Sequence, residues 1–428
     1  MGNMAVYSPL LTYVYCVLTH HQSMVQSTVL FIFTAWGIHN PMAVFFSVLL
    51  QPLMGIEFLS HYQEQYAELH EWYGTQFPLC GAGKLRTVLH RISDSMLAWK
   101  VLLLQSRLIR QRCPELLASG TRVVGRVLDL DVSTLVSFAS KREGAEPGFN
   151  RRYKGKPCFQ LSASYVGKIF VDGKLFAGLC NPKDFFQRAV KRVMALGYGI
   201  TIVRADSAYL TIPNLIFLLT RSLGFAIGAP GTFNVVKAGK VRFKSLARRK
   251  HFSIIPLAKG VSGLDLGLVS FAPGVDARLL IVRRITRRKH RKTGKWVMKT
   301  YYYAIATNLA LSPRKLYAFY HDRQRIESGF RELKRHYHGQ RLPVSNFKGN
   351  EFWIVCKLFA MTLVKLFQHE MLPKALRSLM RRTLVRRLFA RGVVVDGAGT
   401  LHIRVKRKYA WVLRRLFAKL ERMNAALP

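Results

Sequence analysis

The chain has 428 residues, half of them apolar, which allows two or three domains with a substantial core and excludes a disordered basic tail. It carries 67 Lys plus Arg against 22 Asp plus Glu, a net charge of +45. Because this excess persists along nearly the whole length, the expected partner is a polyanion, and nucleic acid is the first candidate.

Residues 1–118 are predicted to be helical, with long apolar-periodic stretches such as MLAWKVLLLQSRLIRQR. Two early runs, VLFIFTAWGI and MAVFFSVLL, are strongly apolar but are split by His39, Asn40 and Pro41. Neither reaches the roughly 18–20 residues that a membrane span requires. No basic segment precedes them, so a signal peptide is not expected either. Buried helices of an N-terminal bundle are the preferred interpretation, ahead of membrane segments.

Strands are predicted next. The stretch TRVVGRVLDLDVSTLVSF alternates apolar and polar residues, as a half-buried strand does, and places Asp129 and Asp131 on one face. A glycine-rich connection, EGAEPGFNRRYKGKP, follows it. Two further strand-like runs, CFQLSASYV and KIFVDGKLFAGL, are interrupted by a turn signal at Asp172–Gly173.

Helices and strands then alternate. A helix is predicted for NPKDFFQRAVKRVMALGYG, a short buried strand for ITIVRADSAY with Asp206 at its polar end, a helix for IPNLIFLLTRSLG and a strand for FAIGAP. Residues 225–310 are strand-like with basic turns, and helix returns in SPRKLYAFYHDRQRIESGFRELKRHY and EFWIVCKLFAMTLVKLFQHEML. The tail from Pro373 alternates Arg with Leu and Val around a hairpin-like stretch, VVVDGAGTLHIRV.

Three strands, a helix, a strand and a later helix form the element order of the ribonuclease H-like fold. In that fold, acids on the first strand, after the fourth strand and on a later helix meet at one point. Here these would be Asp131 (or Asp129), Asp206 and Glu327. Carboxylates so placed can hold two divalent cations about 4 Å apart. Taken singly, Asp206 also fits a turn or cap residue, and Asp131 fits an exposed strand position.

Around the third acid, Tyr320, Arg323, Glu327 and Lys334 stand in the order Tyr-x₂-Arg-x₃-Glu-x₆-Lys. At about 100° per residue, these offsets return to one face of a helix. A carboxylate flanked by two cations and a phenol suits a site that holds a metal ion and binds phosphate. The alternative is an exposed helix with an ordinary i,i+4 ion pair between Arg323 and Glu327.

Other chemistries lack their motifs. The six cysteines are scattered, without a CxxC pair or clustered histidines, so a zinc site or a disulfide framework is not expected and a reducing cytoplasm fits. The sequence contains no Walker loop, no GxGxxG after a strand and no HExxH. Nucleotide-dependent and zincin chemistries are therefore not predicted.

In these motifs the sequence resembles the DDE transposases of bacterial insertion sequences. The Tyr-Arg-Glu-Lys spacing is the signature of the insertion sequence 4 superfamily, and the resemblance is closest to its 1380-type branch. The segments that carry the closer match include LDLDVST, EGAEPGFNRRYKGKPCF, VRADSAY, YYYAIATNL and LPVSNFKGNEFW, and together they span roughly residues 120 to 410. Ala208 departs from the family pattern, which has glycine there before the aromatic residue.

The resemblance implies a role for each of these residues. Asp131, Asp206 and Glu327 would hold two Mg²⁺ ions, for which Mn²⁺ could substitute. The family pattern places the first acid two positions before a Ser or Thr, which selects Asp131 over Asp129. Further residues would contact DNA: Tyr320, Arg323 and Lys334 near the cut, and Trp296 as a stacking residue in the insertion.

The resemblance also implies a division of the chain. A helical end-binding region (1–118) would precede the first part of a ribonuclease H-like core of five strands (119–224), a β-rich insertion (225–310), the rest of the core (311–370) and a basic C-terminal region for DNA contact or dimerisation (371–428).

The functional hypothesis is a cut-and-paste transposase. It would hydrolyse DNA at terminal inverted repeats and join the freed 3′-hydroxyl to target DNA, acting as a homodimer on DNA in the cytoplasm, at the nucleoid and without a membrane. One alternative is a transposase-derived DNA-binding protein that has lost catalysis. The other is a basic membrane-associated protein, which rests only on the first sixty residues.

Overall fold

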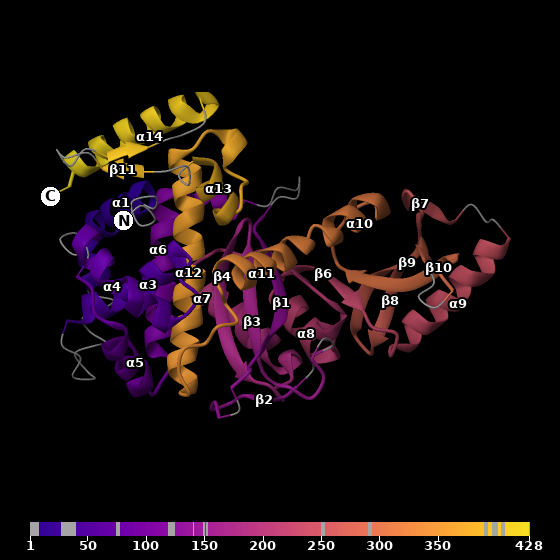
Figure 1. Cartoon of the computed structure of the whole chain (residues 1–428). Helices are drawn as coiled ribbons and strands as arrows, with labels where there is room; N and C mark the ends of the chain where they lie inside the picture. Colours follow the sequence, from indigo (N-terminus) through magenta and orange to yellow (C-terminus); the bar gives the residue numbers. More distant parts are fainter. Residues whose placement is uncertain are drawn as a thin grey trace.

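The structure is a computed structural model of the chain (Figure 1). It describes residues 8–26, 40–73, 78–118, 125–139, 141–148, 150, 153–249, 253–289, 293–388, 393–395, 401–403 and 407–427.

The N-terminal region is helical in its described parts, as predicted. Its elements are α1 (Ser8–His20), α3 (Pro41–Met54), α4 (Leu59–Tyr73), α5 (Ala82–Arg91), α6 (Met96–Arg112) and the short 3-10 helix η2 (Pro114–Leu117). Helix α3 contains the apolar run MAVFFSVLL and is buried along almost its whole length. Asn40 caps it by accepting a hydrogen bond from the backbone N–H of Ala43. The other apolar run, VLFIFTAWGI, lies outside the described residues.

The burial of α3 is explained by α12 (Phe347–Met371), a long apolar helix that packs against α1, α3, α5 and α6 on one side and against strand β4 on the other (Figure 1). In the part of the chain that the structure describes, α12 is the one helix long and apolar enough to cross a membrane, and 89% of its apolar window is buried inside the protein. Helices α3 and α4 pass the same test only as a pair, across a bend of 103°. The apolar run in α3 therefore finds its burial within the protein.

One large mixed sheet forms the centre of the molecule. Its strands are β1 (Val127–Val136), β2 (Glu146–Pro147), β3 (Pro157–Val166), β4 (Ile169–Ala177), β5 (Ile202–Ala205), β6 (Gly224–Ala229), β7 (Ile255–Ala258), β8 (Val261–Ala272), β9 (Val275–Lys289) and β10 (Trp296–Thr307). Five of them lie in the order β4-β3-β1-β5-β6, with β1, β5 and β6 parallel and β3 antiparallel to both of its neighbours. This order is consistent with the predicted ribonuclease H-like core.

The turn between β3 and β4 corrects one prediction. It lies at Gly167–Lys168, where Gly167 has a φ of +61°, and not at Asp172–Gly173. Asp172 sits inside β4, where its carboxylate accepts hydrogen bonds of 2.9 and 2.8 Å from the Arg192 guanidinium. The Asp-Gly pair resembles a turn signal in sequence, but the aspartate is retained in the strand by this ion pair.

The segment 225–310 also differs from its prediction. Its first strand, β6, lies inside the central sheet between β5 and β10 and so belongs to the core, and β7 to β10 extend the same sheet. A helix, α9 (Asn234–Arg248), lies within the segment and buries Val236, Gly239 and Phe243 against β8, β9 and β10. These residues are three and four positions apart, which is a helical spacing. The helix was not predicted because basic residues lie between these positions. In Figure 1 this extension points away from the N-terminal helices.

The remaining helices flank the sheet or follow it. They are η3 (Pro182–Phe185), α7 (Phe186–Ala195), η4 (Ser207–Tyr209), α8 (Ile212–Thr220), α10 (Pro313–His321), α11 (Gln324–His336), η5 (Lys374–Leu376), α13 (Arg381–Leu388) and α14 (Arg407–Ala425). Strands β11 (Val393–Val395) and β12 (Leu401–Ile403) pair as the hairpin predicted in the tail.

The single helix predicted over SPRKLYAFYHDRQRIESGFRELKRHY is two helices, α10 and α11, with a break at Asp322–Arg323. At the break, tighter hydrogen bonds replace the α-helical pattern: Arg323 N–H donates to the carbonyl of Tyr320, and Ile326 N–H to that of Arg323. Tyr320 therefore belongs to α10, whereas Glu327 and Lys334 belong to α11.

Candidate active site

Two of the predicted acids lie side by side where β5 ends next to the middle of the parallel strand β1. In the register of β1 and β5, Asp129 is opposite Arg204 and Leu130 is opposite Ala205. The next residues along the two strands are Asp131 and Asp206. Parallel register thus brings together two carboxylates that are 75 residues apart in sequence.

The structure separates the two aspartates of β1. Asp129 is only 2% exposed, and both of its carboxylate oxygens accept hydrogen bonds of 2.7 Å from Arg204. Asp131 lies two residues further along β1. It is partly exposed and lies 3.2 Å from the Arg323 guanidinium. Of the two aspartates, Asp131 is therefore the one available to a ligand.

Arg323 connects the first acid with the third. Its Nη1 faces Asp131, and its Nη2 lies 3.5 Å from Glu327, whose side chain is 51% exposed. The predicted Arg323–Glu327 pair thus forms, but the same guanidinium also reaches β1. Tyr320 completes the group from α10. Gly228 of β6 leaves it room, since a Cβ there would lie 2.7 Å from the Tyr320 hydroxyl.

The electrostatics also indicate that the three acids converge. Burial raises the pKa of Asp131 to about 6, and repulsion from Asp206 and Glu327 adds to this rise, while Arg323 opposes it. Asp206 is also the cap of η4, because its Oδ1 accepts a hydrogen bond of 2.9 Å from Ala208 N–H. Asp206 is therefore a cap residue, which was one of its two interpretations. This role does not exclude a role as metal ligand, since Asp206 also borders an open cleft together with Asp131.

The donor chemistry fits a hard divalent cation. Asp206 and Glu327 repel the carboxylate of Asp131, so a shared positive charge would be favourable there, and oxygen donors are preferred by Mg²⁺ and Mn²⁺. Asp131, Asp206 and Glu327 are the residues that would hold such ions. The Arg323 guanidinium also supplies positive charge between Asp131 and Glu327.

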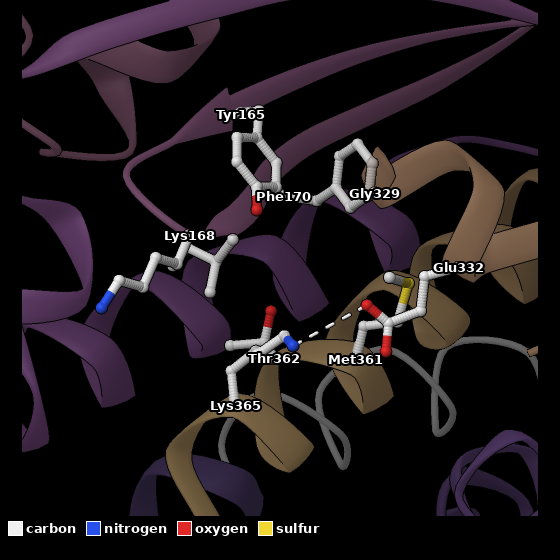
Figure 2. A pocket seen from close by; sticks show the side chains of 9 residues that line it. Tyr165, Lys168, Phe170, Gly329, Glu332, Met361, Thr362 and Lys365 are labelled. Carbon is white, nitrogen blue, oxygen red and sulfur yellow. Dashed lines mark ion pairs between the residues drawn. The ribbon is translucent and has the colours of Figure 1, made fainter. Parts of the chain in front are cut away.

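Helix α11 is fixed on its other faces. Gly329 lies against the Phe170 ring so closely that a Cβ would come within 2.9 Å of it, and Glu332 pairs with Lys365 of α12 at 3.7 Å (Figure 2). In the last turn, Lys334 Nζ donates a hydrogen bond of 2.8 Å to the carbonyl of Thr134, and burial lowers its pKa. Lys334 therefore attaches α11 to β1, three residues beyond Asp131.

Trp296 is not part of this cluster. It is the first residue of β10 and is 58% exposed, with the Arg287 guanidinium 5.1 Å from its ring centre. Only Ala304–Thr307, at the other end of β10, pair with the core strand β6. At about 3.3 Å per residue, Trp296 lies about 26 Å along the strand from Ala304.

A second group of possible metal ligands lies elsewhere. Ligand atoms of Cys113, Glu115 and His369 lie within 4.8 Å of one another, although sequence spacing did not suggest it. Each of these three side chains already has an interaction partner within the protein. His369 pairs with Glu115 at 3.2 Å, and the Cys113 thiol donates to Glu370 at 3.5 Å. All six cysteines are free.

The comparison with known families agrees with the mixed α/β fold. Residues 79–426 match the family described as Transposase DDE domain group 1. No curated protein matches the chain. Because the family match covers most of the sequence, the protein belongs to the DDE transposase domain family.

Proposed function

We propose that the protein is a cut-and-paste transposase of the insertion sequence 4 superfamily, nearest to its 1380-type branch, and that Asp131, Asp206 and Glu327 form its active site. One observation carries this proposal: parallel register and the α10–α11 junction bring three acids from three separate segments beside one arginine. Repulsion from Asp206 and Glu327 at the partly buried carboxylate of Asp131 is unfavourable unless a ligand offsets it.

Bound Mg²⁺ ions, or Mn²⁺ in their place, would supply positive charge to the attacking and leaving oxygens of a phosphodiester. Asp131, Asp206 and Glu327 would hold two such ions and orient the scissile phosphate between them. At this site water would attack phosphorus and release a 3′-hydroxyl at each transposon end. That hydroxyl would then attack a target phosphodiester, so that the new bond to phosphorus replaces the bond to the target's 3′-oxygen, which leaves as a 3′-hydroxyl.

The neighbouring side chains would position DNA. Arg323 and Tyr320 stand beside the acids, where a guanidinium and a phenol can bind phosphate oxygens. Lys334 uses one N–H on Thr134, which leaves two for a phosphate. Trp296 would stack on a base of DNA that extends along the β9–β10 strands.

The basic surface suits end and target DNA, with binding that weakens steeply as salt increases. Two ends must be cut together, so we propose a homodimer assembled on DNA, in the cytoplasm at the nucleoid. The burial of α3 and α12 inside the protein supports this interpretation over a membrane-associated protein.

Cleavage of the element's own ends in Mg²⁺ tests the proposal. Asp206→Ala and Glu327→Ala should each bind end DNA like the unmodified protein but lose cleavage by at least about a thousandfold. Retained cleavage by both variants would contradict the assignment. End binding without nicking by the unmodified protein would favour the alternative, a transposase-derived DNA-binding protein without catalysis.

A further inference from the structure

Arg204 is a buried cation that sequence inspection did not single out. It lies on β5, two residues before Asp206, and its side chain is 3% exposed. Its Nε and Nη2 each donate a hydrogen bond of 2.7 Å to the carboxylate of Asp129, which lies two residues before Asp131. This bidentate pair therefore joins β1 and β5 two residues before the two proposed ligands, Asp131 and Asp206.

The same guanidinium also reaches the helix junction. Its Nη1 donates to the carbonyl of Phe319 at 2.5 Å and lies 3.5 Å from Asp322, while the Phe319 ring is 4.6 Å from the guanidinium carbon. Phe319 and Asp322 are the residues on either side of Tyr320–His321, and Asp322 directly precedes Arg323. A side chain from one of the three segments that carry the proposed site thus contacts the other two.

We infer that Arg204 is a positioning residue for the reaction: it sets the spacing of Asp131 and Asp206 and holds the α10–α11 junction, and with it Glu327, against them. The inference rests on the proposed active site. A buried ion pair is an expensive way to stabilise a core, because apolar residues of similar volume often do as well or better. Apolar packing does not fix the orientation of neighbouring groups. The planar guanidinium of arginine does, because its N–H groups point in fixed directions, and here they orient three segments at once.

The direct test replaces the guanidinium group of Arg204 and keeps the positive charge. Arg204→Lys leaves a single ammonium that cannot pair with both Asp129 oxygens while it also donates to Phe319. We expect this variant to bind Mn²⁺ about tenfold more weakly, the lower end of the 10- to 100-fold that direct partners of metal ligands contribute, because Arg204 positions the ligands through their neighbours in the chain. Binding would be followed by loss of the free Mn²⁺ EPR signal, using the full chain on a pre-cleaved end duplex, with the duplex alone as blank.

The chain contains a matched control. Arg192 and Asp172 form another bidentate pair, with hydrogen bonds of 2.9 and 2.8 Å, that joins α7 to β4. Arg192→Lys makes the same chemical change at a pair that contacts none of the three acids, so Mn²⁺ binding should stay within about twofold of the unmodified protein. An equal loss in Arg192→Lys would mean that the effect is general destabilisation and would overturn the inference.

A second variant covers the case in which Arg204→Lys fails to fold. Asp129→Asn combined with Arg204→Gln removes both charges together, so no buried charge is left without its partner. The inference expects a folded protein with weakened Mn²⁺ binding. Binding within about twofold of the unmodified protein, in either folded Arg204 variant, would overturn it.

The same assay separates this inference from the proposed function. Asp206→Ala and Glu327→Ala should abolish Mn²⁺ binding at the site if these acids are the ligands. If they bind like the unmodified protein, the proposed active site is wrong. If they lose binding while the Arg204 variants retain it, only the positioning role is wrong.

Discussion

At the residue scale, the two aspartates of β1 show how neighbours of one type take different roles. They are two residues apart on one strand face, yet Asp129 is enclosed by Arg204 and Asp131 is open to the cleft. The difference comes from the register with β5, which places a cation opposite the first aspartate and a carboxylate beside the second. Stability should therefore depend on Asp129 and catalysis on Asp131.

Replacing each aspartate by asparagine tests this division. Asp129→Asn leaves the Arg204 charge buried without its partner and should lower the free energy of unfolding by about 3–5 kcal/mol. Asp131→Asn removes a carboxylate that burial and like charges already disfavour, so stability should change by no more than about 1 kcal/mol while cleavage is lost. Urea unfolding and end cleavage would measure both effects. A stable Asp129→Asn beside an unfolded Asp131→Asn would contradict the division.

At the element scale, helix α11 is positioned by close packing as well as by charge. Gly329→Ala should push α11 away from the Phe170 ring, at a cost of about 1–3 kcal/mol that exceeds the gain of about 1 kcal/mol in helix propensity. Gly83→Ala in α5 is the control, because among the described residues no packed neighbour lies within 4 Å of the place its Cβ would take, and it should stabilise the protein. Thermal unfolding would compare them, and Phe170→Leu should partly restore Gly329→Ala.

The β9–β10 strands offer a second prediction at this scale. Trp296→Ala should weaken DNA binding by about 1–3 kcal/mol, the usual contribution of one stacked base. Met298→Ala removes an exposed side chain two residues along the same strand face but no aromatic ring, and should leave binding unchanged. Arg288→Ala should reduce the slope of log K against log salt by about 1. Equal effects of Trp296→Ala and Met298→Ala in fluorescence anisotropy titrations would argue against stacking.

At the scale of the whole molecule, the N-terminal helices and the catalytic sheet share one core. Helix α12 contacts α1, α3, α5 and α6 on one side and β4 on the other, so its apolar surface is covered from both directions. The family match begins only at residue 79, within this shared core. The apolar segment before it is therefore expected to serve stability as much as DNA binding.

Deletion of residues 1–78 tests this expectation. The deletion removes α1 and α3 and exposes the apolar side of α12, so the protein should aggregate or lose cooperative unfolding. Size-exclusion chromatography and thermal unfolding would follow the outcome. A soluble truncated protein that unfolds at the original temperature would show that these helices are dispensable for the core.

Much of this architecture could be predicted from local patterns. Alternation predicted β1, and periodicity predicted the N-terminal and C-terminal helices. The order of elements indicated Asp131 (or Asp129), Asp206 and Glu327 as a metal site, and that assignment stays a prediction. Local patterns failed where a distant partner decides the outcome. Asp172–Gly173 has the sequence of a turn, but the ion pair with Arg192 keeps the aspartate in β4. The helix that contains Val236 and Phe243 was not predicted, because basic residues interrupt its apolar positions.

The sequence by itself determined the net charge, the class of most elements and the residue types of the site, because these depend on composition and short-range spacing. Only the tertiary structure gave the physical reason why Asp131 and not Asp129 faces the cleft, and showed that α10 and α11 break at Asp322–Arg323. It also decided that Arg204 joins the three segments. The reason is physical: strand register and the burial of a charge are set by residues far away in sequence, and they become visible only when the chain is folded.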